Sequence, residues 1–395
     1  MTISPTDATD TDDNLGPMHW NPADGGGDGT GTGTTRRRRR WFGPAIFGLL
    51  AFLIVAIVAS SFVTLPYYVI APGSASPVDN LVRTSDRSKL YPHQGDVLFA
   101  TVSEYKARPL DAVHSWFDHN IQLIPQQRIL GNNKPQDLTK IDQQAMTDSR
   151  ETAVVVALRR IGAKESGTGV VVQDVDQTSA AAAAGLKVGD VILSMDGKPT
   201  MIRSDVTTDI TSHKPGDTGT VVVQSKNASG PRTITVRYGS VPADPDGRRA
   251  ANPNKAFLGI GYETKDRRFD VPYTVSIDPG SVVGPSAGLA FTLELIDSLT
   301  PGELTGGQKI AVTGTIASDG SVGPVGGVAQ KTAAVKAAGA KYFLVPPEEL
   351  KEANAHKGKN LVVVPITSVD EALSFLATHG GDVSPLPPAG TTSAG

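Results

Sequence analysis

Gly284-Pro285-Ser286-Ala287-Gly288 opens the stretch that decides the fold, and Gly326-Gly327-Val328-Ala329-Gln330-Lys331 closes it. Between these two motifs, the residue pattern predicts a helix over 289–299 and a hairpin over 309–323. A further helix is expected over 332–338. A helix followed by a hairpin can fold back on itself and bring the two motifs close together. Ser286 and Lys331, 45 positions apart, are therefore expected to share one site.

Serine and lysine together form a candidate nucleophile and base. A serine hydroxyl needs a neighbouring base to attack an amide, and lysine serves if its surroundings keep it neutral. Both residues are expected where helices begin. There the helix dipole disfavours an ammonium, and free backbone N–H groups stabilise an oxyanion. We interpret Ser286 as the nucleophile and Lys331 as its base; a simple helix N-cap is the alternative for Ser286.

Two other kinds of site fit parts of the same stretch. The first motif also matches the Gly-x-Ser-x-Gly turn of serine hydrolases that use a histidine. Only His356 and His379 follow Ser286, and a Ser-His hydrolase acting on esters stays open. Residues 326–332 look like a phosphate loop, but Gln330 stands where that loop needs glycine. No nucleotide site is predicted.

Taken together, these motifs resemble the proteolytic domain of the Lon family, which uses a serine–lysine dyad. The resemblance extends over the segments 284–288, 299–300, 313–316, 320–322, 324–331 and 337–346. It implies that the nucleophile is supported by Gly284, Pro285, Ala287 and Gly288. It also implies that Thr313 contacts the lysine amine, and that the chain forms a homo-oligomer. Val283 departs from the family, because many members carry an acidic residue there that would help to orient the dyad.

Residues 163–240 resemble a PDZ domain of the type found in bacterial proteases. The run Gly185-Leu186-Lys187-Val188-Gly189-Asp190-Val191-Ile192-Leu193 carries this resemblance. It implies that a peptide C-terminus adds as a strand beside 170–172, with its carboxylate held by backbone N–H groups. The expected peptide-binding residues are Gly167, Thr168, Gly169, Val170 and Val171. A purely structural spacer is the alternative.

The segment before the PDZ-like region indicates that this region is an insertion. A strand is expected over 96–102 and a helix over 146–161. Their order resembles the first half of a Lon proteolytic domain. The PDZ-like region is therefore expected to interrupt one catalytic domain.

The N-terminal region predicts a membrane anchor. Arg36–Arg40 form a block of five arginines, and residues 41–65 carry no charge. About 25 uncharged residues can span a bilayer core of roughly 30 Å, and the arginines are expected to stay in the cytoplasm. The chain has a net charge of −3 and no cysteine. These counts give no electrostatic case for nucleic-acid binding and exclude thiol catalysis.

The sequence thus predicts an α+β fold, a Lon-type proteolytic domain with an inserted PDZ domain, preceded by one transmembrane helix. The expected parts are a disordered cytoplasmic N-terminus with the arginine block (1–40), the transmembrane helix (41–65), the first part of the catalytic domain (66–162), the PDZ domain (163–240), the part with the dyad (241–379) and a disordered tail (380–395). The PDZ and catalytic parts are expected outside the cytoplasmic membrane.

The function expected from these parts is ATP-independent hydrolysis of protein or peptide substrates by a membrane-anchored serine endopeptidase. Its PDZ domain would recruit or gate the substrate. No cofactor, metal or nucleic-acid partner is expected. Two more alternatives remain: an inactive, membrane-tethered PDZ scaffold, and a Lon-like peptidase that works with a separate ATPase.

Overall fold

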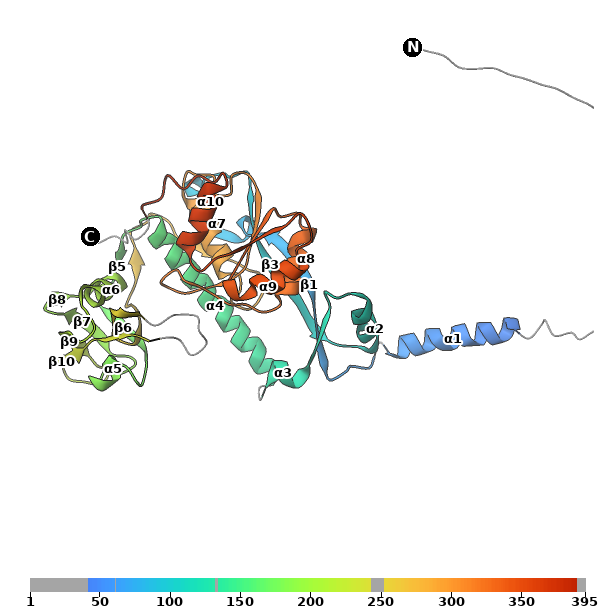
Figure 1. The fold of residues 1–395 in the computed structure, drawn as a ribbon, viewed down its shortest axis with the longest axis horizontal. Helices are drawn as coiled ribbons and strands as arrows, with labels where there is room; N and C mark the ends of the chain where they lie inside the picture. The colour runs from blue at the N-terminus through green and yellow to red at the C-terminus, as the bar shows by residue number, and fades with distance from the viewer. Residues whose placement is uncertain (1–41, 61, 132–133, 243–251, 389–395) are drawn as a thin grey trace, which may run out of the picture. The chain divides into compact units, whose positions relative to one another are not determined.

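The computed structural model describes residues 42–60, 62–131, 134–242 and 252–388 (Figure 1). The disordered segment and arginine block expected over 1–40 lie outside these residues, as does the end of the tail, 389–395. Two compact units divide the chain, 1–57 and 58–395, and each is considered by itself.

The first unit contains most of helix α1 (Phe42–Ser60). Among the described residues, no helix combines the length and the apolar content needed to cross a membrane. The transmembrane helix expected over 41–65 is therefore not supported by the structure.

The second unit contains a mixed six-stranded sheet, counted over the described residues. In spatial order its strands are β20 (Val362–Pro365), β19 (Tyr342–Val345), β16 (Lys309–Val312), β3 (Asp96–Lys106), β1 (Tyr67–Pro77) and β4 (Gln122–Pro125). β16 runs parallel to β3 and to β19, whereas β1 is antiparallel to β3. Strands from before and after the PDZ-like region thus form one sheet, in which the two groups meet where β16 pairs with β3. This is the arrangement expected if that region is an insertion.

Alternation of apolar residues along the strands gives this sheet two buried faces. Val97 and Phe99 of β3 face one core with α7, and Leu98 and Ala100 face the other with α8. The helices of this part are α2 (Pro109–Phe117), α3 (Gln126–Leu130), α4 (Pro135–Arg160), α7 (Gly288–Leu299), α8 (Val328–Ala337), α9 (Leu350–His356) and α10 (Val369–Thr378). All twelve residues of α7 are buried. A helix buried all round is fixed in position by its neighbours.

Short elements complete the catalytic part. The 3-10 helices are η1 (Asp79–Leu81), η2 (Arg87–Lys89) and η3 (Pro347–Glu349). The two-stranded pairs are β2 (Val82–Thr84) with β15 (Val275–Ile277), and β17 (Thr315–Ile316) with β18 (Val322–Gly323). The hairpin expected over 309–323 is thus confined to β17 and β18. β16 lies instead in the central sheet, because both of its faces are apolar and buried.

A second sheet forms the PDZ-like part, where its strands gather with two helices (Figure 1). In spatial order the strands are β10 (Arg232–Arg237), β9 (Thr218–Gln224), β7 (Val191–Met195), β6 (Val170–Val175) and β13 (Ile260–Thr264), with β8 (Lys198–Pro199) beside β7. The helices are α5 (Ala180–Ala183) and α6 (Arg203–Ser212). A hairpin of β11 (Gly239–Val241) and β12 (Asn252–Phe257) precedes β13.

The position of β13 differs from the sequence-based expectation. The residues after 240 were expected to belong to the catalytic part, but β13 pairs antiparallel with β6. Leu258 and Ala256, just before β13, are buried in the core of this second sheet. The chain enters and leaves this part through the paired strands β5 (Glu165–Ser166) and β14 (Arg268–Phe269).

This topology makes the catalytic part dependent on both chain segments. A fragment that begins at Lys265 lacks β1, β3 and β4, so β16 keeps β19 but loses its other partner, β3, and the core around α7 is exposed. We expect that fragment to aggregate or to melt without a cooperative transition, as measured by gel filtration and circular dichroism.

The matched variant keeps both segments and replaces residues 167–264 with a short Gly/Ser linker. Because Ser166 pairs with Arg268, the two chain ends already lie side by side and a short linker spans them. This variant should be monodisperse and melt cooperatively. A cooperatively folded fragment from Lys265 onward would contradict the interdependence of the two segments.

Candidate active site

The Thr313 hydroxyl connects the two residues expected to react. Thr313 directly follows β16 and is fully buried. Its Oγ1 donates to the backbone carbonyl oxygen of Ser286 at 3.1 Å and accepts a hydrogen bond from Lys331 Nζ at 3.1 Å. The backbone N–H of Gly314 also donates to the Ser286 carbonyl oxygen, at 2.9 Å. Thr313 thus makes the lysine contact that the family resemblance implies, and it holds the serine backbone as well.

A glycine-rich turn places Ser286 just before α7. Gly284 has φ +89°, a conformation that favours glycine. Its N–H donates to the carbonyl oxygen of Asp142 at 3.1 Å, and Ser149 Oγ donates to that of Pro285 at 3.0 Å. Both partners belong to α4, so this helix fixes the turn. Ser286 itself is half-buried.

Gly288 allows the turn to approach its neighbours closely. A Cβ atom at this position would lie 2.6 Å from Ile316 Cγ2 and 2.8 Å from Ser149 Oγ. Any side chain at residue 288 would therefore push the first turn of α7 away from α4 and β17. Ala287, the N-cap of α7, is buried.

Two backbone donors beside the serine have no protein acceptor. Within the described part of the chain, the N–H groups of Ser286 and Ala287 donate no hydrogen bond. They stand at the beginning of α7, at the positive end of its dipole. Free N–H groups in this position can stabilise a developing oxyanion.

Lys331 lies in the first turn of α8 and is 3% exposed. The helix begins after Gly327, which has φ +67°, and the Lys331 N–H donates to the Gly327 carbonyl oxygen at 2.9 Å. A Cβ atom at residue 327 would lie 2.7 Å from Val102 Cγ1, so only glycine lets α8 begin this close to β3. Burial lowers the pKa of Lys331 to about 8, and the neighbouring charge of Glu349 opposes that shift.

Glu349 is a member of the site that sequence reasoning missed. It ends η3 and is 7% exposed. Its Oε1 accepts the backbone N–H of Val325 at 2.8 Å, and its Oε2 is buried without a partner among the described residues. Burial raises the pKa of this carboxyl group. The sequence shows only an acidic pair after two prolines, with no sign that one of the acids lies near Lys331.

The structure joins Ser286 and Lys331 through Thr313, with no direct hydrogen bond between their side chains in the described residues. The histidines of the alternative mechanism lie elsewhere. Within the same residues, neither His356 nor His379 hydrogen-bonds to Ser286. His379 is exposed; its Nδ1 lies 2.7 Å from the carbonyl oxygen of Phe375, and its ring stacks on Phe375.

The residues expected to bind a peptide do not lie at a free edge. Val170 and Val171 pair with β7 on one side and with β13 on the other. The N–H of Thr168 donates to the carbonyl oxygen of Lys265, and that of Gly169 to the carbonyl oxygen of Met201. A Cβ at Gly167 would lie 2.3 Å from Thr264 Cγ2, so this position is also closed. Among the described strands, the edges of this sheet are β13, beside β6, and β10 on the opposite side.

Comparison with known proteins agrees with this division of the chain. Residues 265–378 match the Lon protease (S16) C-terminal proteolytic domain, and residues 154–236 match a PDZ domain. This protein contains a Lon proteolytic domain and a PDZ domain. The Lon match includes Ser286, Thr313 and Lys331. It begins directly after β13 ends, which fits the assignment of β13 to the other sheet.

Curated relatives share the domains over limited lengths. Over 121 residues the chain is 34% identical to the Lon protease of Haemophilus influenzae, covering 30% of this chain and 15% of that protein. Over 166 residues it is 31% identical to the Lon protease of Vibrio parahaemolyticus, covering 40% and 20%. A probable periplasmic serine endoprotease DegP-like of Pseudomonas fulva is 38% identical over 88 residues, covering 22% and 18%. The chain thus matches only a fifth or less of the length of these relatives.

Among solved structures, the PDZ domain of an SdrC-like protein from Listeria monocytogenes is similar to part of the chain. The match has 23% identity and a TM-score of 0.20, and covers 24% of this chain and 87% of that chain.

The buried lysine lowers the stability of the fold at neutral pH. The ordinary pKa of lysine is 10.5, and the folded protein lowers it to about 8. Below about pH 8 the folded state therefore holds a buried ammonium that costs about 3 kcal/mol. The cost decreases as the pH rises from 8 to 10.5. Lys331→Met should thus stabilise the protein at pH 6.5 by about 2 kcal/mol, after loss of the hydrogen bond to Thr313. The gain should be smaller at pH 9.5, as measured by urea unfolding.

Lys336→Met is the matched control, because Lys336 lies on the same helix and is exposed. Its free energy of unfolding should change by less than about 0.5 kcal/mol at either pH. Equal destabilisation by Lys331→Met at both pH values would show that the lysine is not held in a disfavoured charged state.

Proposed function

We propose that this protein is a serine endopeptidase in which Ser286 is the nucleophile and Lys331 is the general base. The Lon proteolytic domain supports peptidase activity. The observation that carries the assignment of roles is the buried lysine: its pKa is lowered to about 8, and its amine donates to Thr313 beside the serine. An amine of this kind is partly neutral near physiological pH and can accept a proton.

Thr313 keeps the amine available for that step. Its hydroxyl hydrogen is donated to the Ser286 carbonyl oxygen, so Thr313 offers Lys331 only a lone pair. The amine therefore uses one N–H for Thr313 and keeps its own lone pair for the serine proton. In this proposal the serine side chain rotates to meet the amine when substrate binds, as hydrogen bonds in free enzymes often tighten only in the complex.

The reaction then follows the usual course of acyl transfer. Ser286 Oγ bonds to the scissile carbonyl carbon while Lys331 takes the hydroxyl proton. The N–H groups of Ser286 and Ala287 stabilise the oxyanion. The C–N bond breaks as the ammonium returns a proton to the leaving amine. Water, deprotonated by the same lysine, then attacks the acyl carbon; the bond from Ser286 Oγ to that carbon breaks, and the ammonium returns its proton to Oγ.

We further propose that this cleavage needs no nucleotide. The 395 residues contain no Walker-type loop, and the likeness to the phosphate loop fails at Gln330. The family model that this chain matches over residues 265–378 is the Lon proteolytic domain. A separate ATPase partner is the competing possibility, and stimulation of cleavage by ATP in a cell extract would favour it.

For the PDZ domain, we propose that a peptide substrate adds along β13. This strand is the edge of its sheet next to β6, and a peptide can pair with an edge strand through main-chain hydrogen bonds. Arg203 of α6 covers part of that edge: its guanidinium donates to the Tyr262 carbonyl oxygen and lies 4.6 Å from the centre of the Tyr262 ring. In this proposal the peptide displaces Arg203, so Arg203 controls the access of a substrate peptide to β13.

Attachment to a membrane and assembly into a homo-oligomer stay predictions from the sequence. The arginine block and the uncharged stretch are the basis of the prediction that the catalytic part lies outside the cytoplasmic membrane. If so, protease added to intact spheroplasts should digest the C-terminal region and spare residues before 41. Protection of the C-terminal region until the cells are lysed would contradict this orientation.

The proposed chemistry makes activity depend on pH. Peptide cleavage should rise up to tenfold per pH unit below pH 8 and level off above it, as Lys331 loses its proton. Ser286→Ala and Lys331→Arg should each reduce kcat/KM by about 10³-fold or more, because the two residues act as a unit and guanidinium stays charged. Thr313→Val should cost about tenfold to a hundredfold by misplacing the amine. Steady-state cleavage of a fluorogenic peptide measures all three.

Two further variants test the electrostatics of the same site. Glu349→Gln removes a neighbouring negative charge that favours the ammonium, so the rising limb should move to lower pH. Lys336→Arg, on the exposed side of α8, should leave the profile unchanged. Substantial cleavage by Lys331→Arg would rule out lysine as the base and favour a mechanism with His356 or His379.

A further inference from the structure

Helix α7 carries two carboxylates into the protein core. The Glu294 and Asp297 side chains are both fully buried. Glu294 Oε1 accepts the hydroxyl of Ser298 at 2.8 Å, but its Oε2 has no partner among the described residues. Asp297 Oδ1 accepts the backbone N–H of Leu304 at 2.8 Å, whereas its Oδ2 has no hydrogen bond in the same residues. Unpaired buried carboxylate oxygens are costly, so a cationic partner is expected here.

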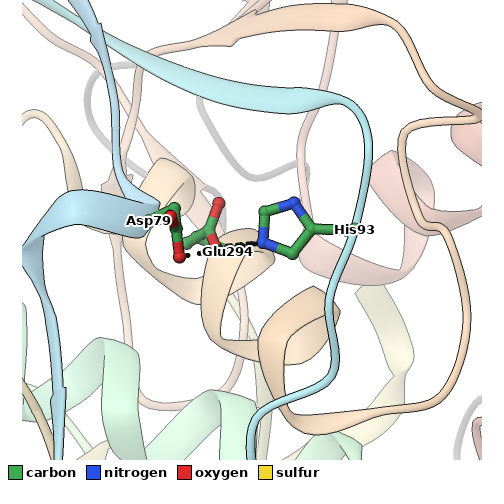
Figure 2. Close-up of side chains that lie close together, drawn as sticks. All are labelled: Asp79, His93 and Glu294. Atoms are coloured by element: carbon green, nitrogen blue, oxygen red, sulfur yellow. Dashed lines mark ion pairs between the residues drawn. The ribbon is translucent and has the colours of Figure 1, made fainter.

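His93 and Asp79 face Glu294 from two other chain segments (Figure 2). His93 Nε2 lies 3.2 Å from Glu294 Oε1 and 3.9 Å from Asp79 Oδ1. One ligand atom from each of the three residues lies within 4.8 Å of the other two. Around a tetrahedral Zn²⁺, with bonds of about 2.1 Å, ligand atoms are separated by about 3.4 Å. The 3.2 Å between His93 Nε2 and Glu294 Oε1 is close to this value, whereas the 3.9 Å between His93 Nε2 and Asp79 Oδ1 is longer, so the exposed Asp79 side chain would have to move closer to bind the same ion.

The other nitrogen of His93 is held as in many metal sites. Nδ1 lies 3.1 Å from the carbonyl oxygen of Gly95 and 3.8 Å from Asp297 Oδ2. These two acceptors can hold a proton on Nδ1, so a metal ion that replaced a proton on Nε2 would meet the Nε2 lone pair facing Glu294 and Asp79. A histidine ligand is commonly oriented by such a hydrogen bond from its second nitrogen to a carbonyl or carboxylate.

The loop that carries His93 is fixed to α7 and the segment after it. The Tyr91 N–H donates to the carbonyl oxygen of Ser298 at 2.8 Å, and the Gln94 N–H donates to Glu303 Oε2 at 2.6 Å. Gly95 has no room for a side chain, because a Cβ would lie 1.9 Å from Thr305 Oγ1. The site is therefore built from rigid backbone on the side of α7 and His93. Its opening lies on the side of Asp79, whose side chain is 55% exposed and lets an ion enter.

We propose that His93 Nε2, Glu294 and Asp79 bind one divalent transition-metal ion, with Zn²⁺ as the best-fitting probe. An imidazole with two carboxylates is a ligand set that suits such ions, and a water molecule from the open side would complete the tetrahedron. The ion would tie η1 and the 90–95 loop to α7, the helix that begins directly after Ser286. This site is separate from the proposed catalytic residues, and the proposal stands whether or not the protein cleaves peptides.

The competing arrangement needs no metal. A proton on His93 Nε2 would form a buried ion pair with Glu294, and this hydrogen bond raises the pKa of His93 to about 10. Proton and metal ion compete for the same lone pair, so the experiment must decide between them.

A second group of two acids and a histidine supplies a matched control. Asp196, Asp209 and His213 also lie close together in the PDZ-like part. Their carboxylates already have partners: Asp196 Oδ1 accepts the N–H of Thr220 at 2.6 Å, and Asp209 Oδ1 accepts the hydroxyl of Tyr238 at 2.8 Å. Asp196→Asn therefore makes the same chemical change as Asp79→Asn in a group with no need of an ion.

The test is metal binding by the full chain after removal of bound ions with a chelator. Equilibrium dialysis against Zn²⁺, followed by elemental analysis, should give one Zn²⁺ per chain for the wild type and for Asp196→Asn. Asp79→Asn should bind at least tenfold more weakly, and His93→Gln should lose stoichiometric binding. Zn²⁺ should raise the melting temperature of the wild type and of Asp196→Asn by several degrees, and that of His93→Gln by less than one degree.

Asp79 is exposed, so its variant tests the site even if changes at His93 or Glu294 prevent folding. Three results would each overturn the proposal. They are a wild-type chain that retains no Zn²⁺, equal affinity of the wild type and Asp79→Asn, and equal occupancy by Mg²⁺ alone at the same concentration. The first of these would favour the buried ion pair between His93 and Glu294.

Discussion

The two hydrogen bonds of the Thr313 hydroxyl depend on the central sheet. Thr313 follows β16 without a break, and its N–H continues the ladder by donating to the Leu344 carbonyl oxygen at 3.0 Å. Because this hydrogen bond to β19 fixes the Thr313 backbone, its hydroxyl reaches Ser286 on one side and Lys331 on the other. β16 in turn lies beside β3, which comes from the chain before the PDZ domain. The proposed chemistry therefore rests on strands far apart in the sequence.

Ionisable side chains are buried in this core at two places. At both places, their burial is unfavourable for the stability of the fold. Lys331 is buried among apolar residues of α8, and Glu294 and Asp297 lie on the fully buried α7. Burial raises the pKa of Asp297 to about 7, as it lowers that of Lys331. Proteins commonly retain such groups where chemistry or ligand binding requires them. Near Ser286 the function proposed is proton transfer, and beside His93 it is ion binding.

Short-range patterns in the sequence predicted much of the catalytic part. The motifs around Ser286, Thr313 and Lys331 lie within one continuous stretch, and the helix over 289–299 agrees with α7 to within one residue. Longer-range features were not predictable in the same way. The residues after 240 were assigned to the part with the dyad, but alternation of apolar residues does not say which sheet a strand joins, and β13 pairs with β6. Glu349, Asp79 and His93 were missed because each acts with a partner distant in the sequence.

The parallel pairing of β3 with β16 also sets the order in which this protein can be completed. Phe99 pairs with Val312, which is synthesised 213 residues later. At about 5 to 20 residues per second, translation takes roughly 10 to 40 s to cover that distance. The whole PDZ domain is made in this interval and has its own core, so it can fold first. Ser286, Thr313 and Lys331 therefore cannot come together until the ribosome has passed Lys331, and by then the whole PDZ domain has been synthesised.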